Sequence, residues 1–182
     1  RQPGLSQRGM RFASLSSPEW FRITGGLRPF RLGAPALDAF PQKAWVRALT
    51  RAMRHQSGAR LDYQASGGYP PLKEELASYL GLGRGVRCTA DQIMIVAGIQ
   101  SGLSLVANLL LDIGDAVWME DPGYPLARMA FEAAAASPVP IPVDREGLVV
   151  SIGKARCPNA RLAYVTPSHQ FPLGVTMSYA RR

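Results

Sequence analysis

From Thr89 onwards, short apolar segments alternate with longer segments of helical periodicity, and this alternation restricts the fold more than any other property of the chain. The apolar segments have the length and flanking residues of β-strands. Strands are predicted over residues 93–97, 116–120, 139–143 and 162–166. Helices are predicted over residues 100–112, 125–136 and 149–156. Apolar strands that alternate with helices indicate an α/β fold, in which helices cover both faces of a mostly parallel sheet.

The residues before Thr89 have a different character. Residues 1 to about 40 are rich in Gly, Pro and Ser and predict a linker that leads into an extended segment. Two helices are predicted next, over residues 41–55 and 70–80; each has proline in its first turn, and glycines end the second one. At the other end, residues 177–182 predict the start of a further helix without a capping residue, so we expect a truncated domain.

Composition narrows the class of protein. The chain has 182 residues, of which 47% are hydrophobic and 19% charged, so it is long and apolar enough to bury a core. Cys88 and Cys157 are isolated and form neither a disulfide framework nor a metal site, which favours a reducing cytoplasm. The longest apolar run, over residues 103–111, is too short to span a bilayer, and we expect no membrane partner.

The net charge of +8 admits two interpretations. A polyanion such as nucleic acid is one candidate partner for a basic chain. The arginines are scattered, however, and no basic stripe with interleaved aromatic residues is present. We therefore expect the charge to affect solubility rather than to bind DNA within this domain.

Two turns of the predicted sheet have the chemistry of a ligand site. The turn around Gly98 and Gln100 joins a strand to a helix, where exposed N–H groups and the helix dipole favour an anion. Most such turns bind nothing, so this pattern is weak alone. After the next strand, Tyr124 follows Asp-Pro-Gly at the carboxyl edge of the sheet, where open α/β folds bind ligands. Its ring suits either stacking on an electron-poor ligand or capping the following helix.

Other candidate residues are less specific. Tyr63 precedes a helix in a glycine-rich loop and has a hydroxyl that can reach a phosphate, although a surface tyrosine is the simpler interpretation. His169 follows a predicted strand, and nothing pairs with it as a metal ligand. Glu120 and Asp121 are adjacent and therefore make a poor acid–base pair. Lys154 is interpreted as a solvated helix residue.

Taken together, these segments resemble the fold type I, class I/II aminotransferases that depend on pyridoxal 5′-phosphate. More narrowly, they resemble the aminotransferase-like effector domain of MocR-type regulators, a branch of the GntR transcription factors. The supporting stretches are FRLGAPALDAFPQKAWVRALTRAMR, LDYQASGGYPPLKEELASYLGLGRGVRC, DQIMIVAGIQSGLSLVANLLLDIGDAVWMEDPGYPLAR and TPSHQFPLGVTMSYARR. The resemblance implies a linker over residues 1–29, from a winged helix-turn-helix domain, and a partial cofactor-binding domain over residues 30–182.

The resemblance also implies a role for individual residues. The turn with Gly98, Ile99 and Gln100 would hold the cofactor phosphate, and Tyr124 would stack on the pyridine ring. Tyr63 would reach the phosphate of the neighbouring subunit, which implies a homodimer.

Two further regions of the resemblance concern the substrate and the pyridine ring. Gly33 would approach the substrate carboxylate. Where classical members carry Asn-Pro-Thr-Gly, this chain has Phe171 to Gly174, and the contact to the ring hydroxyl would come from His169 or Gln170.

The catalytic half of such a site is not found in this sequence. The lysine that bonds to the cofactor, the aspartate at the pyridine nitrogen and the carboxylate-binding arginine would all lie beyond Arg182. We therefore expect no catalytic residue and no transaminase activity from these 182 residues alone. The expected partners are an amino acid or amine, and DNA only through the preceding domain. The alternatives are a fragment of a free-standing class I/II aminotransferase and a degenerate gene fragment.

Overall fold

The computed structural model describes residues 4–14, 35–54, 62–63 and 66–182. The chain divides into two compact units. One unit contains Arg1–Arg22 and Ala97–Arg182, and the other contains Ile23–Val96. Among the described residues, no helix is long and apolar enough to cross a membrane.

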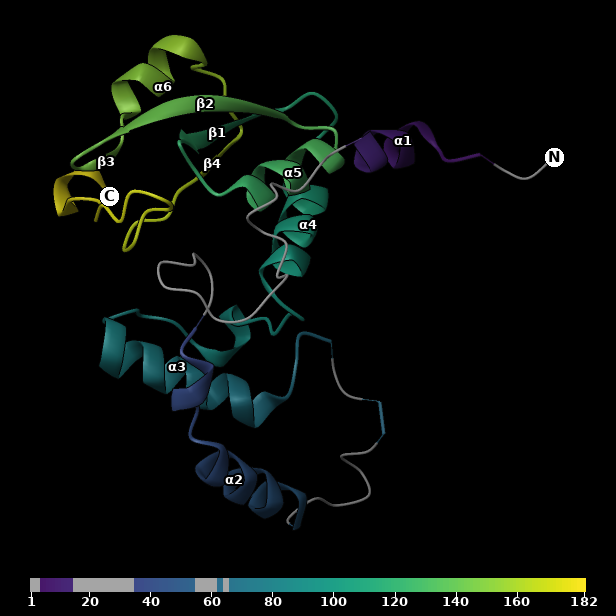
Figure 1. The fold of residues 1–182 in the computed structure, drawn as a ribbon, viewed down its shortest axis with the longest axis vertical. Helices are drawn as coiled ribbons and strands as arrows, with labels where there is room; N and C mark the ends of the chain where they lie inside the picture. The colour runs from purple at the N-terminus through teal and green to yellow at the C-terminus, as the bar shows by residue number, and fades with distance from the viewer. Residues whose placement is uncertain (1–3, 15–34, 55–61, 64–65) are drawn as a thin grey trace. The chain divides into compact units, whose positions relative to one another are not determined.

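The unit of residues 23–96 is helical in its described part (Figure 1). It contains the short helix η2 (Leu37–Ala39), α2 (Gln42–Arg54), α3 (Pro70–Arg84) and η4 (Ala90–Gln92). Both long helices were predicted, but α3 continues through Gly81 and Gly83. It ends at Gly85, whose φ of +65° is the left-handed conformation that glycine adopts at helix ends.

The predicted strand over residues 93–97 is absent. Ile93 is extended and Ile95 N–H donates to the Gly67 carbonyl at 2.9 Å, but no described segment pairs with these residues as a neighbouring strand. An apolar run becomes a strand only when another strand satisfies its backbone N–H and C=O groups. The sequence pattern shows the apolar run and not the presence of a partner, so this prediction was wrong.

The other unit contains a four-stranded sheet in the order β3-β2-β1-β4. Its strands are β1 (Ala116–Asp121), β2 (Ser137–Asp144), β3 (Gly147–Leu148) and β4 (Leu162–Tyr164). β1 is parallel to both β2 and β4, and β2 and β3 form an antiparallel hairpin. The α/β fold with a mostly parallel sheet is therefore confirmed.

Helices cover both faces of this sheet. α4 (Ile99–Leu110) and α5 (Pro125–Ala133) lie on one face, and α6 (Val150–Arg156) lies on the other (Figure 1). Alternate residues of β1 face the two layers, as the pleat requires. Val117 and Met119 pack in the core with α4 and α5, and Trp118 packs in the second core around Ile141.

The side of β2 that faces away from β1 carries three prolines at alternate positions: Pro138, Pro140 and Pro142. Ser137 N–H donates to the Asp115 carbonyl at 2.8 Å, on the side of β1. Because N–H groups alternate along a strand, the prolines occupy the positions whose missing N–H would point away from β1. That side offers carbonyls instead, and Arg156 Nη1 donates to the Pro140 carbonyl at 2.6 Å.

The last residues form no regular α-helix, contrary to the prediction for residues 177–182. Met177 is buried against Ile141 and Leu148, and its N–H donates to the Pro167 carbonyl at 2.8 Å. Only the single turn η5 (Tyr179–Arg181) follows. Met177 is apolar because it packs in the core, and not because it belongs to the buried face of a helix.

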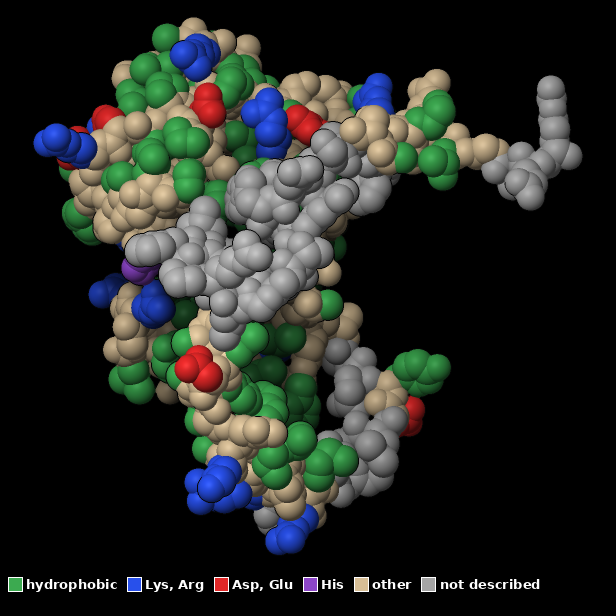
Figure 2. Space-filling view, in the orientation of Figure 1, with side chains coloured by type: hydrophobic (Ala, Val, Ile, Leu, Met, Phe, Trp, Pro, Cys, Tyr) green, Lys and Arg blue, Asp and Glu red, His purple; other side chains and the backbone are tan. Residues whose placement is uncertain are grey.

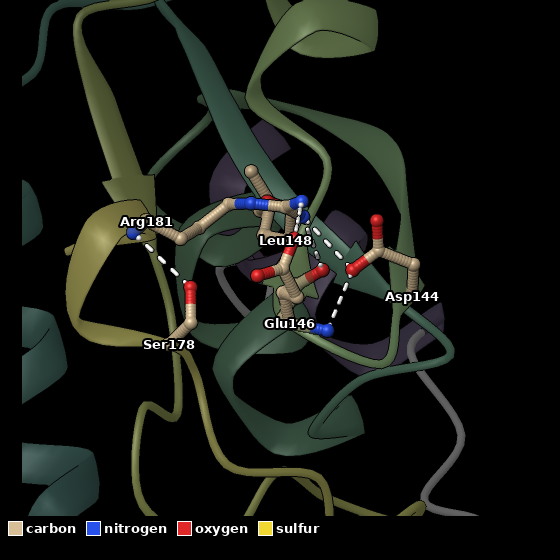
Figure 3. Close-up of polar contacts among 6 residues, drawn as sticks. Asp144, Glu146, Leu148, Ser178 and Arg181 are labelled. Atoms are coloured by element: carbon tan, nitrogen blue, oxygen red, sulfur yellow. Dashed lines mark hydrogen bonds and ion pairs between the residues drawn. The ribbon is translucent and has the colours of Figure 1, made fainter.

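Arg181 fastens this C-terminal segment to the β2–β3 turn (Figure 3). Its guanidinium contacts Asp144 Oδ1 at 2.9 Å and Glu146 Oε2 at 3.0 Å. It also donates to the carbonyls of Gly147 and Leu148, each at 3.2 Å. Multiple bonds from one half-buried guanidinium hold the turn more firmly than an exposed pair does.

We expect Arg181→Gln to lower the urea midpoint of unfolding more than Arg128→Gln, because Arg128 makes one exposed pair with Glu132.

The dependence of stability on pH tests the contact between Arg181 and Asp144. The Glu146 N–H depresses the pKa of Asp144, burial opposes this, and Arg181 lowers the pKa further. A depressed carboxyl pKa stabilises the fold above the unfolded value of 3.8, and this stabilisation is lost as the pH falls through the folded value. Urea titrations at about pH 6 and about pH 3 should therefore show a larger acid loss for the wild type than for Asp144→Asn. Equal losses would contradict this role.

Candidate functional site

The first part of the candidate site is the N-terminus of α4. Gly98 is the N-cap residue, with φ of +149° and no side-chain cap. Its conformation rather than its surroundings requires glycine, since nothing lies within 4 Å of where a Cβ would stand. Ile99 and Gln100 follow and are exposed. The first N–H groups of a helix have no partner within the helix, so this turn presents donors and a positive dipole end to an anion.

The second part is the loop between β1 and α5. Gly123 packs so closely on Glu120 that a Cβ would lie 2.9 Å from the Glu120 carbonyl carbon. Tyr124 is the N-cap of α5, and Pro125 occupies the first helical turn. The Tyr124 ring is partly buried against the core that α4 and α5 share. This packing agrees with the interpretation that Tyr124 caps the helix. Stacking of its ring on a ligand stays a prediction.

The third part is the loop after β4, which returns to the same place. The rings of Phe171 and Tyr124 meet edge to face, with centroids 5.9 Å apart and planes at 78°. His169 is exposed, whereas Gln170 is buried with 2% of its surface accessible. The structure thus brings Tyr124 together with the loop after β4.

The amide of Gln170 is fully engaged by the protein. Its Nε2 donates to Glu120 Oε2 at 3.2 Å and to the Pro122 carbonyl at 2.8 Å. Its Oε1 accepts from Leu173 N–H at 3.2 Å. These bonds tie the loop after β4 to the loop after β1.

Glu120 was rejected as a site residue in the sequence analysis because Asp121 is adjacent to it, but its carboxylate accepts three hydrogen bonds in this region. Only 4% of its surface is accessible. Its carboxylate accepts from Thr166 N–H at 3.2 Å, from Thr166 Oγ1 at 2.5 Å and from Gln170 Nε2. An acid in an otherwise apolar strand was the available signal, because a buried carboxylate requires donors.

Tyr164 on β4 is a second residue that the sequence did not single out. It is half-buried, and its ring meets that of Phe131 at 6.2 Å. Burial raises the pKa of the Tyr164 phenol, and the neighbouring Tyr124 and Glu120 raise it further. The phenol therefore stays protonated at neutral pH beside the candidate site.

The remaining predicted residues lie elsewhere or outside the described part. Tyr63 is fully exposed in the unit of residues 23–96. Gly33 lies outside the described residues. Lys154 is exposed on α6, across the sheet from α4 and α5, as its interpretation as a solvated lysine requires. Within the described residues, no group of three His, Cys, Asp or Glu is placed to hold a metal ion.

The surface of the described residues shows no concentration of positive charge on the face in view. Lys and Arg side chains occur at several separate places on it, some of them with acidic side chains nearby (Figure 2). A nucleic-acid interface would gather basic side chains in one stripe. On the face in view, the basic side chains of the described residues form no such stripe.

The site has part of what pyridoxal 5′-phosphate needs. The uncapped α4 N-terminus suits a phosphate, and the Tyr124 ring suits a pyridine. Within the unit that contains these groups, the described lysine is Lys154 on α6, across the sheet from α4 and α5. The residues present therefore fit non-covalent binding of the phosphate and ring.

Comparison with known proteins gives a consistent result. The aminotransferase class I and II family matches residues 29–169. The probable rhizopine catabolism regulatory protein MocR of Rhizobium meliloti is 41% identical over 96% of this chain and 34% of its own length. The 2-aminoadipate transaminase of Thermus thermophilus is 30% identical over 82% of this chain and 36% of its own length.

Among solved structures, kynurenine aminotransferase of Pyrococcus horikoshii superposes with a TM-score of 0.73 at 31% identity. The match covers 82% of this chain and 38% of that one, and that structure was solved in complex with PMP. The chain thus spans about a third of the length of the curated relatives it matches.

Proposed function

Because this chain belongs to the class I and II aminotransferase family, we propose that it binds pyridoxal 5′-phosphate as part of the effector-sensing domain of a transcriptional regulator. The observation that carries the cofactor is the pair of helix N-termini in one packed unit: α4 begins at an uncapped glycine turn, and α5 begins at a partly buried tyrosine. When bound, the cofactor supplies a carbonyl group that takes up primary amines.

The residues of this chain have distinct parts in the proposal. The N–H groups of the turn with Gly98, Ile99 and Gln100 bind the phosphate, and the Tyr124 ring lies against the pyridine. His169 is exposed at the adjacent loop and is the candidate donor to the ring hydroxyl, whereas the engaged amide of Gln170 holds that loop in place.

Three further parts of the proposal concern the ligand and the assembly. The small molecule that the domain senses is an amine or amino acid, as the transaminase relative suggests. Gly33 approaches its carboxylate, and Tyr63 reaches the cofactor phosphate of a second copy in a homodimer. The proposal also includes a cofactor-binding domain over residues 30–182, after a linker, and a cytoplasmic location.

The regulatory role rests on the greater similarity to MocR than to the transaminase. In this role residues 1–29 link the domain to a winged helix-turn-helix that binds DNA. The helix α1 (Gln7–Ser14) of this segment packs against α5, whose N-cap residue is Tyr124. A groove of about 400 Å³ runs beside it, lined by small residues: Ser6, Gly9, Ser104, Asn108, Ala130, Ala133 and Ala134. The alternative is a free-standing aminotransferase, and the reading frame before Arg1 distinguishes the two.

Binding of pyridoxamine 5′-phosphate to the purified chain tests the cofactor proposal. This probe has no aldehyde, so exposed lysines cannot bind it covalently. We expect saturable binding by calorimetry, and Tyr124→Ala should weaken it about three- to ten-fold, the value of one aromatic contact of up to about 1.5 kcal/mol.

Tyr179→Ala is the matched control, since Tyr179 is 95% exposed in η5 and should not affect the affinity. The absence of saturable binding, or equal affinities for the wild type and Tyr124→Ala, would refute the proposed site.

A further inference from the structure

Glu120 accepts hydrogen bonds from two places that lie far apart in the sequence. Its Oε1 accepts from Thr166 N–H, and its Oε2 accepts from both Thr166 Oγ1 and Gln170 Nε2. All three groups donate to the carboxylate, and Glu120 is nearly inaccessible to water. This arrangement requires an acceptor at both oxygens, which only a carboxylate provides.

The same bonds join the two loops of the candidate site. Gln170, placed by Glu120, also donates to the Pro122 carbonyl, two residues before Tyr124. Its own backbone closes the second loop, since Gln170 N–H donates to the Val175 carbonyl at 2.9 Å. The loop residue that meets the Tyr124 ring, Phe171, comes directly after Gln170.

We propose that Glu120 is a positioning residue: its buried carboxylate holds the loops after β1 and β4 together, and thereby sets the Tyr124 ring against Phe171 for ligand binding. The ligand-binding part rests on the proposed function. Glu120 itself touches neither ring in this assignment and acts through Thr166 and Gln170.

Glu120→Gln is the sharpest variant, because it keeps the shape of the side chain. An amide has one acceptor and one donor group, so in either orientation its nitrogen faces Thr166 N–H or the Gln170 amide. Glu132→Gln is the matched control: the same substitution breaks an exposed pair with Arg128 on α5. Thr166→Val removes the hydroxyl that donates to Glu120, whereas Thr166→Ser keeps it.

Two measurements on each folded variant separate the two layers of the proposal. Hydrogen–deuterium exchange reports the loops without any ligand. We expect Glu120→Gln and Thr166→Val to accelerate exchange of Leu173 and Gly174 at least ten-fold while α4 is unaffected, and Thr166→Ser and Glu132→Gln to match the wild type. Affinity for pyridoxamine 5′-phosphate should fall in the same two variants, by up to the about three- to ten-fold expected for Tyr124→Ala.

The outcomes are distinct. Unchanged loop exchange in a folded Glu120→Gln protein, or acceleration spread evenly over all elements, overturns the positioning role. Accelerated loop exchange with unchanged affinity overturns the link between this network and the ligand. If the wild type does not bind the probe, the proposed function fails, and the exchange data alone decide whether Glu120 holds the loops.

Discussion

Replacing Gly123 by alanine is expected to destabilise the sheet unit by about 1–3 kcal/mol, the usual cost of overpacking, and to weaken binding of pyridoxamine 5′-phosphate at least as much as Tyr124→Ala does. The new methyl group would overlap the Glu120 carbonyl oxygen and lie 2.9 Å from its carbonyl carbon. Glu120 is held in place, because its backbone pairs with Ile141 of β2 and its carboxylate is bonded to Thr166 and Gln170. The loop must move instead, and with it the Pro122 carbonyl that accepts from Gln170.

Urea unfolding followed by far-ultraviolet circular dichroism measures the first effect, and calorimetry with the probe measures the second. Gly81→Ala is a suitable control, because its methyl group would meet nothing closer than the Val86 carbonyl at 3.8 Å and would favour the helix. A Gly123→Ala protein with wild-type stability and affinity would show that the loop adapts without cost.

Replacing Phe131 by alanine is expected to cost about 3–5 kcal/mol of unfolding free energy, a large fraction of the stability of an ordinary domain. Phe131 on α5 has no accessible surface and packs in the core with Val117 and Met119 of β1. Its ring also meets Tyr164 of β4 at 6.2 Å, with the planes at 64°. Alanine would leave a cavity where a helix and two strands meet.

The same unfolding assay compares this variant with Leu109→Ala, since Leu109 on α4 is 70% exposed. That control should change the unfolding free energy by no more than about 0.5 kcal/mol. A loss below about 1 kcal/mol for Phe131→Ala would mean that α5 contributes little to this core. Because the chain has two units, the transition of the sheet unit should be followed through Trp118.

Local patterns in the sequence predicted those elements whose stability is largely local or whose partners lie close by. β1, β2, α5 and α6 occur within a few residues of their predicted bounds, because apolar runs and proline at the helix starts determine them. β3 was missed because it has only two residues and depends on pairing with Val143 and Asp144.

The candidate site shows the same division. Tyr124 and its Asp-Pro-Gly loop could be found from their place after a strand. Glu120 could not be interpreted correctly, since its partners Thr166 and Gln170 lie 46 and 50 residues further along. Burial and hydrogen bonding between such distant residues follow from the fold, and a sequence window around Glu120 contains neither.

The alternating prolines of β2 have a practical consequence for anyone who redesigns this domain. The side of β2 that faces away from β1 has no donors at Pro138, Pro140 and Pro142, and the carbonyls of Pro140 and Pro142 already accept from Arg156 and from Val149 N–H, so a further strand cannot be grafted along it. On the opposite flank β4 has no proline in Leu162–Tyr164, and no described strand lies beyond it. Unlike β4, the proline side of β2 is therefore closed to pairing with a further strand.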